Sequence, residues 1–189
     1  MSVYDNCPVL FGRYFRLEYS DLSHCDDLLK VYSDLKSLPL FNSDNCGNDN
    51  FYYKTPERMK EAIEYWHWEY SRKGFVRMSI IDNENDISVG TVEMFCRVAD
   101  DYFTDTNLLR IDLRSDFEKE EYIYDILSVV IVSQKELFNC NSVTTKAIPV
   151  AAERIKALNR AGFRLSEELL IGHDGTEYSD YYIYFFEES

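Results

Sequence analysis

The chain has 189 residues, which suits one domain, and its 46% hydrophobic and 29% charged residues are typical of a folded protein rather than a disordered one. Its formal net charge of -14 argues against nucleic acid as a partner. The negative charge has two interpretations: it attracts cationic small molecules or basic peptides, or it serves only to keep the protein soluble. No stretch approaches the roughly 20 apolar residues of a membrane helix, so no membrane association is expected.

The first half of the chain predicts a strand, two helices and a hairpin. Residues 14–19 alternate as a strand does, and Ser20 or Ser23 can cap a helix that runs to Tyr32. After a polar loop, Thr55 and Pro56 predict the start of a second helix and Gly74 its end. The hairpin pairs residues 75–82 with residues 87–97.

The second half alternates strands and helices. We predict strands at 108–113, 142–148, 163–171 and 181–186, and helices at 116–138 and 150–161, the latter ended by Gly162. Strand–helix–strand units require right-handed parallel crossovers, whereas hairpins give antiparallel pairs. We therefore expect a mixed α/β fold in which the strands beginning at Leu108 and Ser142 are parallel neighbours.

Cysteine and histidine spacing indicates no metal site and no disulfide framework. The five cysteines are scattered, odd in number and without a Cys-x-x-Cys pair, which predicts free thiols in a reducing compartment. The three histidines lack the spacing of metal ligands. Residues 1–10 lack the charged start and apolar run of a signal peptide, so we expect a cytoplasmic protein.

Three segments resemble the GCN5-related N-acetyltransferase (GNAT) superfamily, and most closely its ribosomal-protein alanine N-acetyltransferases. They are the helix ending Ala-Leu-Asn-Arg-Ala-Gly-Phe at 157–163, the aromatic-rich tail at 172–182, and Gly90 after Ile87 and Val89. The resemblance implies one domain over residues 1–189, built on a twisted sheet of about seven strands with helices on both faces. It also implies acetyl-CoA as co-substrate and, as acceptor, a small-molecule amine or a peptide N-terminus, with no prediction of oligomeric state.

The family binds the donor pyrophosphate with the pattern Gln/Arg-x-x-Gly-x-Gly/Ala at the start of its long helix. Here Glu118, Glu121 and Ile123 stand at the three signature positions. One interpretation is a capped helix, Ser115-x-x-Glu118, whose acidic first turn satisfies the helix dipole without a phosphate. In the other, Arg114 and Lys119 hold the phosphate. The resemblance implies these donor-binding residues: Leu113, Arg114, Glu118, Lys119, Glu120, Glu121 and Tyr122.

Catalysis of acetyl transfer to an amine needs a base for the amine and an acid for the leaving thiolate. Glu93 and Asp112 are the candidate bases, and Tyr181 or Tyr182 the candidate acid; ordinary surface acids and packed tyrosines are the alternatives. The loop 41–53 lies where the family builds its acceptor pocket. Two functions follow: an acetyl-CoA-dependent N-acetyltransferase, or a GNAT-fold binding or regulatory module that has lost the donor site.

Overall fold

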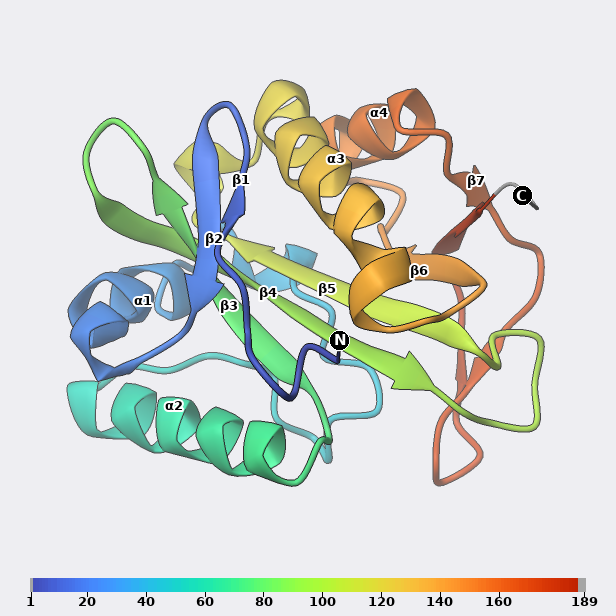
Figure 1. Ribbon diagram of the computed structural model, residues 1–189, viewed down its shortest axis with the longest axis horizontal. Helices are drawn as coiled ribbons and strands as arrows, with labels where there is room; N and C mark the ends of the chain where they lie inside the picture. Colours follow the sequence, from blue (N-terminus) through green and yellow to red (C-terminus); the bar gives the residue numbers. More distant parts are fainter. Residues whose placement is uncertain (1, 187–189) are drawn as a thin grey trace.

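The computed structural model describes residues 2–186, apart from the side chain of Lys135. Its main sheet has eight strands in the order β1-β2-β3-β4-β5-β6-β10-β7, and a separate ribbon pairs β8 with β9. Helices α1 and α2 cover one face of the sheet and α3 and α4 the other (Figure 1). The helices are α1 Cys25–Tyr32, α2 Pro56–Ser71, α3 Glu120–Leu137 and α4 Ala152–Arg160. The strands are β1 Leu10–Phe11, β2 Phe15–Tyr19, β3 Val76–Asp82, β4 Ile87–Arg97, β5 Thr106–Leu113, β6 Ser142–Lys146, β7 Arg164–Leu165, β8 Leu170–Ile171, β9 Glu177–Tyr178 and β10 Tyr181–Phe185.

The sheet is mixed, as predicted. Strands β5 and β6 run parallel and are joined by α3, whereas the other pairs in the sheet are antiparallel. The parallel pairing extends only from Thr106 opposite Ser142 to Leu109 opposite Thr145. Beyond Leu109 the second half of β5 continues without β6 beside it, so the two strands separate toward the start of α3.

Local capping chemistry explains where the helices begin and end. The side chain of Thr55 accepts a hydrogen bond from the backbone nitrogen of Arg58 at 3.2 Å, so the predicted cap of α2 is confirmed. The predicted cap of the first helix was wrong: Asp21 caps a 3₁₀ turn, Leu22–His24, that leads into α1, and its carboxylate accepts from Ser23. The helix α1 itself has no side-chain cap. The helix α2 ends before Gly74, since Lys73 takes the left-handed backbone conformation, with φ of 62°.

Two further predictions need correction. Residues 163–171 do not form one strand: Arg164–Leu165 pairs with β10, whereas Leu170–Ile171 pairs with β9 in the small ribbon. The capping box Ser115-x-x-Glu118 is also wrong. Residues Ser115–Phe117 form a 3₁₀ turn, and α3 begins only at Glu120. Lys119 is at the N-cap position of α3, and its side chain makes no capping hydrogen bond.

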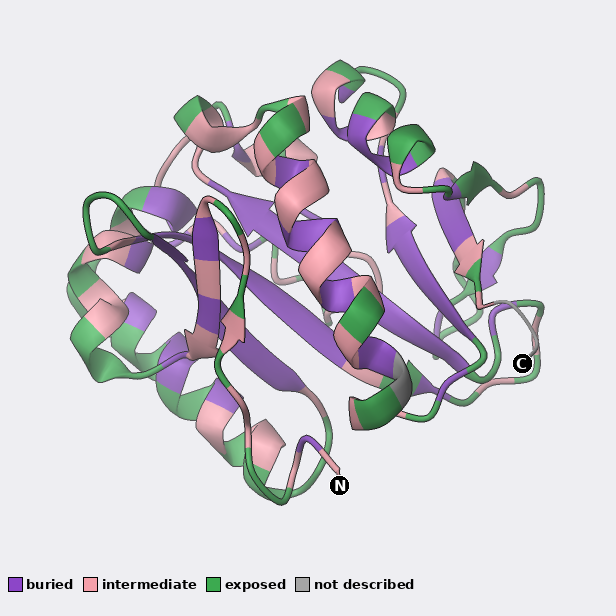
Figure 2. Ribbon diagram, turned by 45° about the horizontal axis from the view of Figure 1, so that its top comes forward, coloured by how far each residue is buried: buried purple, intermediate pink, exposed green. Residues whose placement is uncertain are grey.

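Three apolar clusters hold the layers together. The largest lies between the sheet and α3 and α4, a second lies under α1 and α2, and a third packs around Phe103 and Tyr181. Strands β3 and β5 are buried along their whole length (Figure 2). Any charged residue on these strands is therefore removed from water and needs a partner inside the protein. No helix among residues 2–186 is both long and apolar enough to cross a membrane.

Candidate functional site

A row of three charged residues crosses the middle of the sheet. Arg77 on β3 lies opposite Glu93 on β4, which lies opposite Arg110 on β5, so pairing register alone brings them side by side. Each arginine donates to one oxygen of Glu93, which is 2% exposed. Burial by itself would raise the pKa of Glu93, but the charges of Arg77 and Arg110 lower it below its ordinary value. Glu93 is therefore an ion-paired carboxylate and a weak base.

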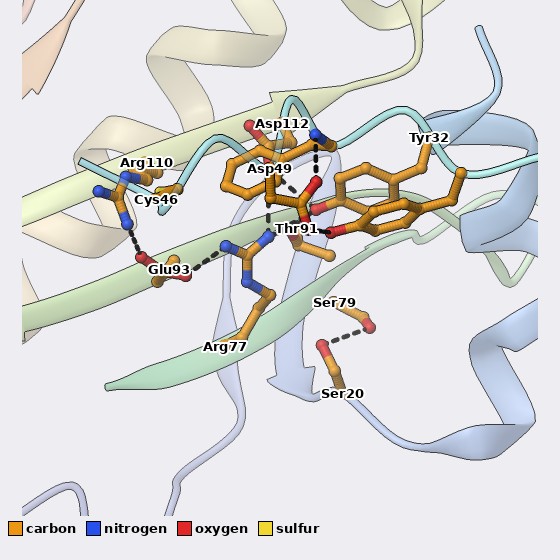
Figure 3. Close-up of polar contacts among 12 residues, drawn as sticks. Ser20, Tyr32, Cys46, Asp49, Arg77, Ser79, Thr91, Glu93, Arg110 and Asp112 are labelled. Carbon is orange, nitrogen blue, oxygen red and sulfur yellow. Dashed lines mark hydrogen bonds and ion pairs between the residues drawn. The ribbon is translucent and has the colours of Figure 1, made fainter. Parts of the chain in front are cut away.

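Arg77 also joins Glu93 to the second candidate base. Its Nη1 donates to Oδ2 of Asp112 at 3.1 Å, and the Tyr32 hydroxyl donates to the same oxygen at 2.8 Å (Figure 3). The Tyr32 hydroxyl also lies 2.7 Å from the hydroxyl of Thr91. Oδ1 of Asp112 has no hydrogen-bond partner within residues 2–186. Burial raises the pKa of Asp112 despite the nearby Arg77 charge. The structure thus brings Glu93 and Asp112 into one buried network.

Tyr181, the candidate acid, joins this network through the loop 41–53. Its hydroxyl donates to Oδ2 of Asp44 at 3.1 Å and accepts from Asn42 at 3.4 Å. Lys146 lies 2.5 Å from the same Asp44 oxygen, and Arg110 donates to the Asp44 backbone carbonyl at 2.9 Å. Burial raises the pKa of Tyr181 well above its ordinary value. Tyr181 is therefore a neutral phenol whose proton is already used in anchoring the loop.

A cavity of about 1190 Å³ lies above the charged row. It is bounded by the loop 41–53, one side of α2, the end of β4 and the turn between β8 and β9. Arg77, Glu93, Arg110 and Tyr181 line it, whereas Asp112 does not. The rest of the lining includes aromatic and acidic side chains and two further arginines: Asp44, Asp49, Phe51, Tyr53, Arg58, Tyr65, Trp66, Glu69, Phe75, Phe95, Arg97, Asp100 and Asp101.

The predicted donor loop, residues 113–122, is held by side chains of α4. Both carboxylate oxygens of Glu118 accept from Arg154, at 2.7 and 2.9 Å. Arg154 is 3% exposed and also donates to the backbone carbonyl of Leu40 at 3.1 Å. Burial opposes its charge, but the Glu118 carboxylate raises the pKa of Arg154 above its ordinary value. A charged, bidentate ion pair therefore links the connection between β5 and α3 to α4.

Backbone amides of the donor loop already bind carboxylates of the chain itself. The amide of Glu120, at the first turn of α3, donates to Glu153 at 3.1 Å. The amide of Ser115 donates to the carboxylate of Asp34, which lies just after α1, at 2.9 Å. Such N–H groups at a helix start are the usual ligands of a phosphate. Here Glu153 binds the first amide of α3, whereas the Ser115 amide belongs to the 3₁₀ turn that precedes the helix.

The remaining candidate residues leave little positive charge for a phosphate. Arg114 pairs with Asp116 at 2.7 and 3.0 Å, and Lys119 lies over the ring of Tyr122 at 5.2 Å. Glu121 is exposed, and the side chain of Leu113 is part of the core. In this conformation the residues of the loop do not fit the pyrophosphate of acetyl-CoA, because carboxylates bind the amides of Glu120 and Ser115 and Asp116 pairs with Arg114. Lys119 is the loop cation that is in no ion pair among the described residues.

The hydrogen bond of Asp34 predicts a pH effect. Partial burial would raise its pKa, but hydrogen bonds from Ser115, Lys36 and Ser37 lower it to about 2. A lowered carboxyl pKa contributes stability above the unfolded value near 3.8, and this contribution is lost as pH falls toward 2. We expect Asp34→Asn to destabilise the protein at pH 7 and the difference from wild type to shrink between pH 4 and 2. Urea unfolding across this range measures it; a pH-independent difference would contradict the ionic role.

Comparison with known proteins supports the resemblance through structure alone. No protein-family model matches the chain, and no curated protein matches it in sequence. A ribosomal-protein-S5-alanine acetyltransferase from Vibrio fischeri superposes with a TM-score of 0.68 at 13% identity, over 93% of this chain and 94% of that one. The ribosomal-protein acetyltransferase RimL, in complex with coenzyme A, also gives 0.68 at 13% identity, over 94% and 98%. An acetyltransferase of the GNAT family from Bacillus anthracis gives 0.66 at 12% identity, over 94% and 98%. The chain therefore has the GNAT acetyltransferase fold.

Proposed function

We propose that this protein is a GNAT-fold module that binds a cationic amine, either a small molecule or the N-terminus of a peptide, and that its donor loop is closed to acetyl-CoA. The observation that carries the proposal is the ion pair of Glu118 with Arg154, together with the carboxylate of Glu153 on the Glu120 amide. An incoming pyrophosphate would have to displace both carboxylates and would meet their negative charge.

The cavity supports an amine as its ligand. Its volume of about 1190 Å³ exceeds the roughly 300–1,000 Å³ of drug-sized sites, so a peptide end also fits. Tyr65, Trp66 and Phe75 are aromatic, and aromatic faces attract cations. Arg77 already lies over Trp66 at 4.6 Å and over Phe75 at 5.9 Å, which leaves Tyr65 as the aromatic side chain of this wall that a ligand would meet. Glu69 lines the same wall, and its side chain is 13% exposed. The net charge of -14 would steer cationic ligands toward the protein.

Calorimetric titration with a short basic peptide tests this proposal. The peptide with a free N-terminus is expected to bind more tightly than the same peptide carrying an N-terminal acetyl group. Glu69→Gln removes a carboxylate from the cavity and should weaken binding about tenfold, which corresponds to about 1.4 kcal/mol. Glu64→Gln makes the same charge change at an exposed position of α2 that does not line the cavity, and serves as control. Equal affinity for both peptides, or an equal effect of both substitutions, would contradict an amine site.

The second candidate function is acetyl-CoA-dependent N-acetyltransfer to an amine. The separation of β5 from β6 beyond Leu109 favours it, as does the presence of Glu93 and Tyr181 on the cavity wall. It requires Arg154 to release Glu118 and the loop to change conformation. Of the two candidate bases, Glu93 has a lowered pKa, and Asp112 has a raised pKa but lies outside the cavity lining. Turnover of acetyl-CoA with a panel of amines would establish this function and overturn the closed module.

A further inference from the structure

Two of the five cysteines lie in contact with each other. Cys96 is the penultimate residue of β4, and Cys140 lies in the connection between α3 and β6, 44 positions later. Their sulfur atoms are 2.6 Å apart. A disulfide bond needs about 2.05 Å, so a small displacement of either side chain brings the two sulfurs to bonding distance. Cysteine spacing alone did not reveal this pair.

The two thiols differ in exposure, and burial raises the pKa of the Cys140 thiol, so Cys96 is the thiol that reacts first with an oxidant. Cys96 is exposed, so a small oxidant in solvent reaches it, whereas Cys140 is 6% exposed and lies directly behind it. The other three cysteines lie against a backbone carbonyl, of Pro8, Pro56 and Asp44 respectively, and not against a second thiol. Cys140 also lies 3.7 Å from the backbone carbonyl of Phe138. An exposed thiol next to a second thiol is the arrangement of a reversible redox pair.

We propose that Cys96 and Cys140 form a reversible disulfide when the protein meets a peroxide. Peroxide oxidises the Cys96 thiol to a sulfenic acid and is itself reduced to one molecule of water. The Cys140 sulfur then attacks the Cys96 sulfur, the S–S bond forms, and the sulfenic oxygen leaves as a second molecule of water with the Cys140 proton. Two thiols thus lose two electrons in total, and a dithiol reductant reverses the change.

The disulfide would affect the cavity wall. It would close a covalent loop containing β5 and α3 and would fix the end of β4, whose last residues line the cavity. A cross-link over a loop of this length reduces the entropy of the unfolded chain. We therefore expect the melting temperature of the oxidised protein to rise by roughly 5–10 °C over the reduced protein.

Thiol counting by mass spectrometry tests the pair on the full chain. Reduced protein is treated with one equivalent of hydrogen peroxide, unfolded and alkylated. We expect three alkylated thiols instead of five, a cross-linked peptide containing Cys96 and Cys140, and five thiols again after dithiothreitol. Cys96→Ser removes the exposed member and should leave all four remaining thiols free, whereas Cys25→Ser should leave the cross-link intact.

Three results would overturn the proposal. One is retention of all five thiols after peroxide; the second is over-oxidation of Cys96 without a cross-link. The third is a disulfide between other cysteines or between two molecules, detected on a non-reducing gel. Because Cys96 is exposed, its replacement by serine is expected to leave the fold intact, and circular dichroism of that variant checks this.

Discussion

Replacing Arg77 with methionine is expected to lower the free energy of unfolding by about 3–5 kcal/mol, the usual loss when one member of a buried ion pair is removed. Arg77 is 2% exposed and provides a cation to both Glu93 and Asp112. Glu93 keeps Arg110 after the substitution, but Asp112 loses its only ion-pair partner among the described residues. Equilibrium unfolding in urea measures the loss.

A second substitution separates the charge effect from lost packing. Arg77→Met leaves the Asp112 carboxylate without its cation. Asp112→Asn removes that negative charge and keeps a side chain of the same shape. The double variant is expected to recover about 1–3 kcal/mol of the loss, the penalty of an unsatisfied buried group. Because burial raises the pKa of Asp112, the single variant Asp112→Asn should itself cost little. Strictly additive effects of the two substitutions would show that Arg77 acts through Glu93 and through packing against Trp66 rather than through Asp112.

Gly90→Ala is expected to destabilise the protein by about 3 kcal/mol, because the added methyl group has no room in the sheet. A Cβ at Gly90 would lie 2.2 Å from the backbone oxygen of Asp112 and 3.1 Å from the Cα of Leu113. Both atoms belong to the paired strand β5, so they can move only if β4 and β5 separate. Thermal or urea unfolding measures the change.

Gly47→Ala provides the matched control. Gly47 has a φ of 61° but no neighbouring atom within 4 Å of an added Cβ, so only backbone strain opposes the substitution. We expect it to cost about 1–2 kcal/mol. If Gly90→Ala cost no more than this control, the close approach of β5 to Gly90 would not be what constrains the residue.

The order of the elements followed from signals that are local in sequence. Thr55 and Pro56 mark the start of α2 because a cap acts within one turn. The prediction failed where a long-range pairing decided the outcome. Residues 163–171 read as one strand, but their two halves pair with different strands, β10 and β9, and local periodicity carries no information about the partner.

The contrast between local signals and long-range contacts also separates the predicted from the unpredicted parts of the site. Glu93 and Asp112 were predicted as candidate bases, and the structure places both in one network. Arg77 and Tyr32, which connect them, were not singled out. One signal in the sequence could have identified Arg77: it lies within the mostly apolar strand Val-Arg-Met-Ser-Ile-Ile. A cation buried in such a strand needs an acidic partner, which points to an acid on a neighbouring strand.

For the donor loop, the sequence showed its acidic character but not what its acids bind. Glu118 and Arg154 are 36 positions apart, and only the packing of α4 against α3 brings them together. The spacing of the residues therefore left two alternatives open, a capped helix or a phosphate held by Arg114 and Lys119. The structure contains a third arrangement, in which α4 supplies both the cation for Glu118 and the carboxylate for the Glu120 amide.

Calorimetric titration of the wild-type protein with acetyl-CoA, supported by thermal melting, tests the closed donor loop most directly. We expect no saturable heat and no change in melting temperature at 1 mM acetyl-CoA. Such a result corresponds to a dissociation constant above about 1 mM. The variant Glu118→Gln/Glu153→Gln, which removes both carboxylates, should gain measurable binding. A wild-type dissociation constant near 10 µM, with a melting shift of roughly 5–10 °C at 1 mM ligand, would contradict the closed loop and favour the acetyltransferase.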